Sequence, residues 1–340
     1  MKQEHFRAWE FAAFSAVTLA ALCLCVCVGS VNISLKDTLL VLKNAVAGLP
    51  QGNATASTIL LSVRLPRVLC VALSGASLAL CGAAMQGLLK NPLADSSTLG
   101  VSSGAALGAV VAIAFGIQLP ALPIAGTMGT AIVFAFASML GILALAYKLD
   151  YSLSTNTIIL IGVVFSMFVS SAMSVVITFA ADKVQQITFW TMGSLQGSSY
   201  FNAAVLGVTL LLCGGVILLQ SRELNAFAVG EDTANHIGVH VRRTKLLVLI
   251  AVSVLIGVCV SIGGTIAFVG LITPHGVRLL VGPNHKRLLP ASCFSGMIFL
   301  LLADLIARTI LKPVELPIGV VTSFIGAVVF VLIFYRARKG

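Results

Sequence analysis

Long apolar runs separated by short polar segments fill most of this 340-residue chain. Only 9% of the residues are charged, whereas soluble domains carry roughly 25%. A helix that crosses a bilayer needs about 20 mostly apolar residues, so the chain has room for about ten. We therefore predict an all-α polytopic membrane protein that forms one transmembrane domain over residues 1–340, with spans at about 11–29, 66–89, 97–117, 121–147, 156–180, 202–219, 246–262, 265–281, 290–308 and 318–335.

Composition excludes several classes of function. The polar segments are too short to fold as separate domains, so a soluble receptor or an energy source must come from other chains. No HExxH or P-loop pattern occurs, which indicates that the chain is not an enzyme. The net charge of +10 fits Lys and Arg in cytoplasmic loops better than a nucleic-acid partner. The eight cysteines lie within apolar runs, and we interpret them as small apolar side chains rather than metal ligands.

The distribution of basic residues predicts the topology. Ten spans place both termini on the same side of the membrane. If that side is the cytoplasm, most of the 21 Lys and Arg residues face inward, as the positive-inside tendency requires. The first run could instead be a secretory signal, but it is long for one and no small-residue cleavage pattern follows. We therefore favour a retained first span with both termini cytoplasmic.

Small residues recur every fourth position between Arg64 and Gly108, in two helical runs joined by a polar break at 90–95. Such a series forms a flat stripe along a helix, because four residues make about one turn. In lipid, stripes of this kind let helix backbones approach closely. We predict tight helix packing along both stripes, which consist of Gly75, Ala79, Ala83 and Gly87, and of Gly100, Gly104 and Gly108.

Three shorter segments are predicted outside the spans. Residues 36–48 are expected to form a surface helix, and residues near 187–195 a short re-entrant helix. The most hydrophilic segment, 220–245, contains Gly230–Gly238, where acidic residues precede a closing glycine. That pattern predicts a short helix with a defined end. It either docks on a soluble partner or simply connects two spans.

Ionisable residues are rare within the spans. Asp304 and Arg308 are four residues apart, so they share a helix face and can pair. An ion pair that orients the helix is favoured over a proton relay. Arg64 and Arg67 flank Leu65-Pro66 at the predicted outer mouth of the second span. They either pair with acidic groups of a partner or reach lipid headgroups.

Several blocks from about residue 60 to the end resemble one family. These are the Arg64–Gly108 stretch, FWTMGSL at 189–195, GEDTANHIG at 230–238, GTIAFVGLITPH at 264–275, LAD at 302–304 and ELPIGV at 315–320. Together and in this order they are similar to the permeases of type II ABC importers, which carry iron–siderophores, haem or cobalamin.

The resemblance implies partners and residue roles. It implies a ten-helix permease fold, a homodimer with the pathway along its axis, two ATPase subunits that use ATP and Mg, and a periplasmic or lipid-anchored substrate-binding protein. No cofactor would be bound by this chain. The bilayer would be a bacterial or archaeal cytoplasmic (inner) membrane. By position, the resemblance assigns coupling to the ATPase to Gly230, Glu231, Asp232, Ala234 and Gly238. It assigns docking of the binding protein to Arg64, Arg67 and Arg308. It assigns a cytoplasmic gate to Asn91, Leu93, Ser154 and Thr155.

The sequence therefore favours an ABC importer permease for a metal chelate, with ferric siderophore the first choice. Cobalamin and haem remain open, because in the family resembled the binding protein mainly selects the substrate. An ion-coupled secondary transporter that acts alone is the alternative class. Such transporters carry carboxylates near the middle of the membrane, whereas Asp304 is nearly alone here.

Overall fold

A computed structural model describes residues 6–50, 53–95, 100–117, 123–151 and 154–337. The described residues form helices and turns without a strand. In the first half of the chain the helices are α1 (Ala8–Cys27), α2 (Leu35–Ala47), α3 (Ala54–Ser57), a π-helical segment (Thr58–Arg64), α4 (Leu65–Leu88), α5 (Val101–Phe115), α6 (Pro123–Leu149) and α7 (Thr155–Phe179).

The second half begins with a short 3-10 turn (Ala181–Lys183) and continues as helices. These are α8 (Val184–Thr191), α9 (Tyr200–Thr209), a π-helical segment (Leu210–Gly214), α10 (Gly215–Leu219), α11 (Ser221–Val229), α12 (Glu231–His236), α13 (Val241–Gly263), α14 (Val269–Val281), α15 (His285–Thr309) and α16 (Ile318–Ala337).

The predicted all-α membrane architecture is confirmed. Seven helices are long and apolar enough to cross a membrane, and the shorter apolar helices Val101–Phe115, Val269–Val281 and Ile318–Leu332 fill the remaining predicted positions. Residues 97–99 and 121–122, predicted to begin two of the spans, lie outside the described residues.

The largest departure from the predicted boundaries is at the second span, expected to begin at residue 66. The helix starts at Ala54 and runs for 35 residues to Leu88. The π-helical segment Thr58–Arg64 joins α3 to α4 without a break. Pro66, the second residue of α4, therefore lies inside a continuous helix, where it cannot donate a backbone hydrogen bond.

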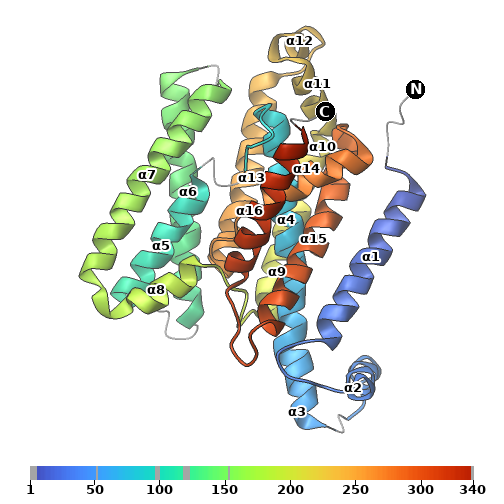
Figure 1. Cartoon of the computed structure of the whole chain (residues 1–340). Helices are drawn as coiled ribbons and strands as arrows, with labels where there is room; N and C mark the ends of the chain where they lie inside the picture. The colour runs from blue at the N-terminus through green and yellow to red at the C-terminus, as the bar shows by residue number, and fades with distance from the viewer. Residues whose placement is uncertain (1–5, 51–52, 96–99, 118–122, 152–153, 338–340) are drawn as a thin grey trace.

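Helix α4 lies at the centre of the bundle (Figure 1), with α13, α14 and α15 packed against it. Helices α5 to α8 form a group on one side of α4, and α1 lies on the other side. The π-helical segment and α3 extend α4 beyond the bundle, and we call that end the α3 end. The opposite end carries α11 and α12 and is called the α12 end.

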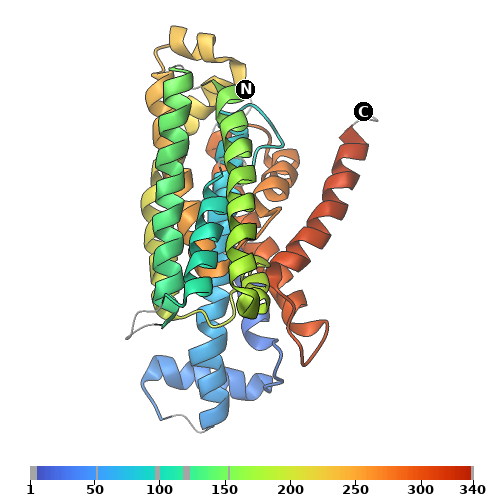
Figure 2. The same cartoon turned by 90° about the vertical axis from the view of Figure 1, so that its left-hand side faces the viewer.

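The start of α1 and the end of α16 both lie towards the α12 end (Figures 1 and 2). Helix α16 leans away from the other helices along most of its length (Figure 2). Its first turn is anchored by the buried Ile318 and Val321, but Phe324 further along is 75% exposed. An apolar surface is therefore left uncovered on this helix.

The small-residue stripes do allow close packing. A Cβ atom on Gly75 would come within 3.0 Å of the carbonyl oxygen of Gly296 in α15, and one on Gly108 would meet the backbone of Thr130 in α6. Gly82, which the four-residue stripe left out, makes an equally close approach to Gly270 of α14. Helix α4 thus packs on two neighbours through backbone contact, because it has glycines on two faces.

The shorter predicted helices are also present. Helix α2 covers the surface helix expected at 36–48 and is capped by the Ser34 hydroxyl, which accepts a hydrogen bond from Asp37 N. The segment near 187–195 contains α8, which begins a few residues earlier than expected, at Val184. In the most hydrophilic segment the structure has two short helices, α11 and α12, where one was predicted.

Replacing Gly82 with leucine tests the packing of α4. We expect the free energy of unfolding to fall by at least about 1–3 kcal/mol, because the side chain would force the α4 and α14 backbones apart. Thermal unfolding of the detergent-extracted chain measures the change. Gly141→Leu on α6 is the matched control, because nothing lies within 4 Å of the Cβ position there. Equal melting temperatures for both variants would contradict the packing argument.

Candidate functional site

A buried cluster of charges ties three helices together near the α3 end. Arg67 of α4 lies between two carboxylates: its Nε donates to Oδ1 of Asp304 at 3.0 Å, and its Nη1 donates to Oε2 of Glu315 at 2.6 Å. On the other side of Asp304, Arg308 Nε lies 2.8 Å from Oδ2. Asp304 is fully buried, so removing either arginine would leave a poorly compensated charge.

The other guanidinium bonds of the cluster hold the end of α1. Arg64 donates to the carbonyl oxygens of Val26 and Val31, both at 2.8 Å, and Arg308 donates to that of Cys25 at 3.2 Å. The last carbonyls of a helix have no partner within it and carry partial negative charge, which favours cations there. Three guanidiniums therefore share two carboxylates and the C-terminal end of α1.

The predicted docking arginines lie together, but they are directed into the molecule. Arg64, Arg67 and Arg308 are only 4%, 7% and 3% exposed. The predicted pairing of Asp304 with Arg308 is confirmed. Asp304 also binds Arg67, 237 positions away in the chain, and no local spacing in the sequence predicts that contact.

Glu315 lies at the exposed edge of the cluster, in the loop between α15 and α16. Burial opposes its charge, but the hydrogen bond and charge of Arg67 outweigh this and lower its pKa below the ordinary 4.5. Because folding lowers the pKa of Glu315, its ion pair with Arg67 stabilises the fold at pH values above the ordinary pKa of a glutamate side chain. This contribution is lost as the pH falls through the pKa of the folded state.

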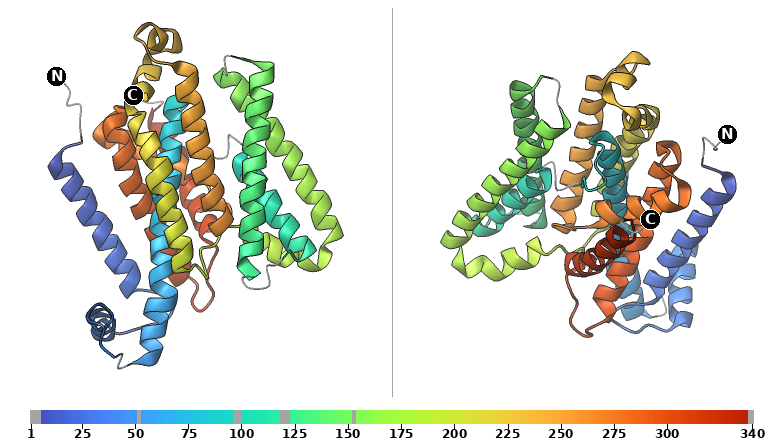
Figure 3. Two further views of the ribbon diagram at one scale, coloured as in Figure 1. Left: turned by 180° about the vertical axis from the view of Figure 1, so that it is seen from behind. Right: turned by 45° about the horizontal axis from the view of Figure 1, so that its top comes forward.

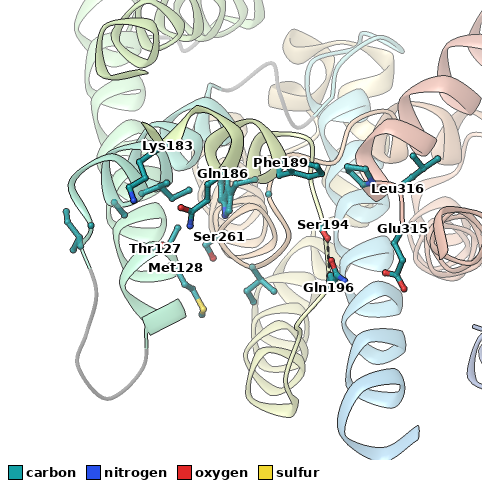
Figure 4. Close-up of a pocket in the computed structure, with 18 residues that line it drawn as sticks. Thr127, Met128, Lys183, Gln186, Phe189, Ser194, Gln196, Ser261, Glu315 and Leu316 are labelled. Carbon is teal, nitrogen blue, oxygen red and sulfur yellow. Dashed lines mark hydrogen bonds between the residues drawn. The ribbon is translucent and has the colours of Figure 1, made fainter. Parts of the chain in front are cut away.

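A cavity of about 590 Å³ adjoins this loop (Figure 4). Its walls come from α5, α6, α8, the end of α13 and the 315–317 segment. Lys183, Gln186, Ser261 and Glu315 are among the polar lining residues, and Trp190 supplies an aromatic face. Glu315 thus belongs both to the cavity wall and to the buried charge cluster. No group of His, Cys, Asp and Glu suited to a metal ion occurs among the described residues.

The predicted coupling residues lie at the opposite end, in α12 and its flanks. Gly230, with φ 147° and ψ 149°, separates α11 from α12 in a conformation that favours glycine. Ala234 is fully buried, and Glu231 accepts a hydrogen bond from Lys245 at 2.7 Å. Asp232 is exposed. Helix α12 is therefore anchored by one face and presents the other, and Gly238 follows it with φ 87°.

The predicted gate residues occupy two separate turns at the α12 end (Figure 1). Asn91 follows α4, and its Oδ1 accepts a hydrogen bond from the exposed Leu93 at 2.9 Å. Ser154 caps α7, which begins at Thr155, and its backbone N–H donates to Asp150 Oδ2 at 3.0 Å. A gate formed by these residues stays a prediction.

Comparison with known proteins identifies the family. The model of the FecCD transport family matches residues 17–336. An ABC transporter permease protein of Bacillus subtilis is 45% identical over 287 residues, which are 84% of this chain and 80% of the relative. A cobalamin import system permease protein of Halobacterium salinarum is 39% identical over 292 residues, which cover 86% and 76%.

A solved structure described as an inward-facing metal-chelate type ABC transporter has a similar fold. The TM-score is 0.84 at 31% sequence identity, and the match covers 96% of this chain and 98% of the other. The arrangement of α1 to α16 is therefore that of a type II ABC importer permease. The chain belongs to the FecCD transport family and is an ABC importer permease subunit, for which a separate subunit hydrolyses ATP.

Proposed function

We propose that this permease imports a metal chelate, with ferric siderophore as the first choice of substrate. The observation that carries the proposal is the match of nearly the whole bundle to a metal-chelate type transporter. Similar permeases are named for hemin, ferric enterobactin, cobalamin and molybdate. Import of haem or cobalamin by the same mechanism is therefore the alternative.

The proposed assembly places different partners at the two ends. Two ATPase subunits bind at α12 in the cytoplasm, and a periplasmic or lipid-anchored binding protein docks at the α3 end. This orientation, with both termini cytoplasmic in a bacterial or archaeal inner membrane, is supported by the basic loops. The second permease copy completes a pathway along the dimer axis. The uncovered apolar side of α16 supplies surface for such a copy.

In the proposed mechanism, closure of the ATPase dimer on ATP displaces α12. Helix α13 follows directly, since the buried Lys245 ties it to Glu231 at the start of α12. Helices α4, α14 and α15 move with α13 because they pack against one another. The proposed cytoplasmic gate between the two copies then opens or closes. Its residues are Asn91, Leu93, Ser154 and Thr155.

Docking of the binding protein is proposed at Arg64, Arg67 and Arg308. Because these side chains are buried in internal bonds, direct contact requires an exchange of partners. Glu315 is the accessible member, with 17% of its side chain exposed. A carboxylate from the binding protein that displaced Glu315 would release the loop before α16 and would open the wall of the adjoining cavity.

An ion-coupled secondary transporter receives less support. Asp304, the carboxylate considered for such a role, is held by Arg67 and Arg308. Its side chain is 1% exposed and both of its oxygens face a guanidinium, which is the arrangement of a structural ion pair.

Uptake into liposomes tests the substrate proposal. With its binding protein, ATPase and internal ATP, the permease should accumulate radiolabelled ferric siderophore rather than haem or cobalamin. Uptake of haem or cobalamin instead would correct the substrate. Uptake by the chain alone, driven by an ion gradient, would contradict the mechanism.

Substitution of Asp232 by lysine tests the ATPase contact. The side chain is exposed, so we expect normal folding but a loss of most ATPase on co-purification, because a charge is reversed within the docking helix. Asp182→Lys, at a similarly exposed site near the other end, is the matched control. Unchanged recovery of the ATPase with Asp232→Lys would remove α12 from the contact.

Replacing Arg67 with lysine tests docking at the α3 end. Lysine keeps the charge but cannot reproduce the fork that reaches two carboxylates. We expect about tenfold weaker association with the binding protein, measured by surface plasmon resonance on nanodiscs. Lys148→Gln, at an exposed position near the α12 end, should leave the affinity unchanged. A folded Arg67→Lys protein with unaltered affinity would exclude Arg67 from docking.

A further inference from the structure

A groove of about 670 Å³ lies beside the first turns of α13, and no role described so far uses it. It changes character along its length: Asn235, His240, Arg242 and Arg243 are at one end, and apolar side chains of α13 line the rest. The full lining is Asn235, His240, Val241, Arg242, Arg243, Leu246, Leu247 and Ile250. One end is therefore cationic and the other fits hydrocarbon.

Arg242 is held in place by two aromatic rings. Its guanidinium carbon lies 4.7 Å from the ring centre of Tyr147, near the end of α6, and 4.0 Å from that of Tyr151, two residues beyond α6. Stacking on aromatic faces orients the planar guanidinium. No carboxylate pairs with Arg242 or Arg243 among the described residues.

Neighbouring acidic residues do not neutralise the cationic end of the α13 groove. Lys245 is turned inward to Glu231, so the charge of Glu231 is already engaged. A second groove, between α10 and the start of α15, also contains basic residues, Arg222 and Lys286, but Glu223 lies among them. The α13 groove has no acidic lining residue, so its cations are not offset locally.

The groove is in the right place for a lipid. Helix α13 is a candidate membrane span from Val241 onward. It runs from the α12 end along the face of the molecule that the left-hand view of Figure 3 shows from behind. Arg243, Leu247 and Ile250 are exposed and spaced by four and three residues, so they lie on one helix face. This face passes from cationic to apolar at the depth where a headgroup meets its acyl chains.

We propose that this groove binds an anionic phospholipid. The phosphate is bound by Arg242 and Arg243, with His240 beside them, and an acyl chain lies along Leu246, Leu247 and Ile250. Basic pockets between membrane helices suit such headgroups. Because Arg242 contacts α6 and belongs to the helix that follows α12, the bound lipid would brace the junction between α6 and α13.

Lipid binding by the full-length chain in detergent tests the proposal, read by native mass spectrometry and by melting temperature. Phosphatidylglycerol should bind and raise the melting temperature, whereas phosphatidylcholine should not. Arg243→Gln should weaken phosphatidylglycerol binding about fivefold and the Arg242→Gln/Arg243→Gln pair more strongly. Arg222→Gln/Lys286→Gln in the second groove is the matched control.

Several outcomes would overturn the proposal. One is equal binding of phosphatidylcholine and phosphatidylglycerol, and another is unchanged phosphatidylglycerol binding by folded Arg243→Gln. A third is a loss of ATPase co-purification with lipid binding intact, which would assign the arginines to a protein contact. Arg243 is exposed and has no hydrogen bond or ion pair to described residues, so its single substitution remains decisive if the double variant fails to fold.

Discussion

Backbone contact between α4 and its neighbours is the constraint on which the rest of the structure depends. Gly75 faces Gly296 of α15, and Gly82 faces Gly270 of α14, with no room for a side chain on either pair. In a bilayer the hydrophobic effect does not press helices together, so such contacts supply much of the packing energy. They also make α4, α14 and α15 a unit in which a shift of one helix displaces the others.

The charged groups connect this unit to the two ends of the molecule. Near the α3 end, Arg67 and Arg308 bind Asp304, while Arg64 and Arg308 hold the last turn of α1. At the α12 end, Lys245 and Glu231 bind α13 to α12. The partners proposed for the two ends would therefore act on one packed core.

Much of the fold could be predicted because apolar run length and small-residue spacing are local properties of the sequence. The spans, the surface helix at α2 and the packing of Gly75 and Gly108 follow from them. The inward direction of Arg64, Arg67 and Arg308 could not be predicted, since it depends on Asp304, Glu315 and the end of α1, which are distant in the chain. The helix begins at Ala54 and not at the predicted residue 66, because a π-helical segment carries it through to Pro66 without a break.

The central claim is that the two ends communicate through this core during ATP-driven import. Its most direct test is the rate of ATP hydrolysis by the permease–ATPase complex in proteoliposomes, measured with and without loaded binding protein on the opposite side of the membrane. The account predicts that loaded binding protein raises the rate. Hydrolysis that does not respond to a bound, loaded binding protein would contradict it.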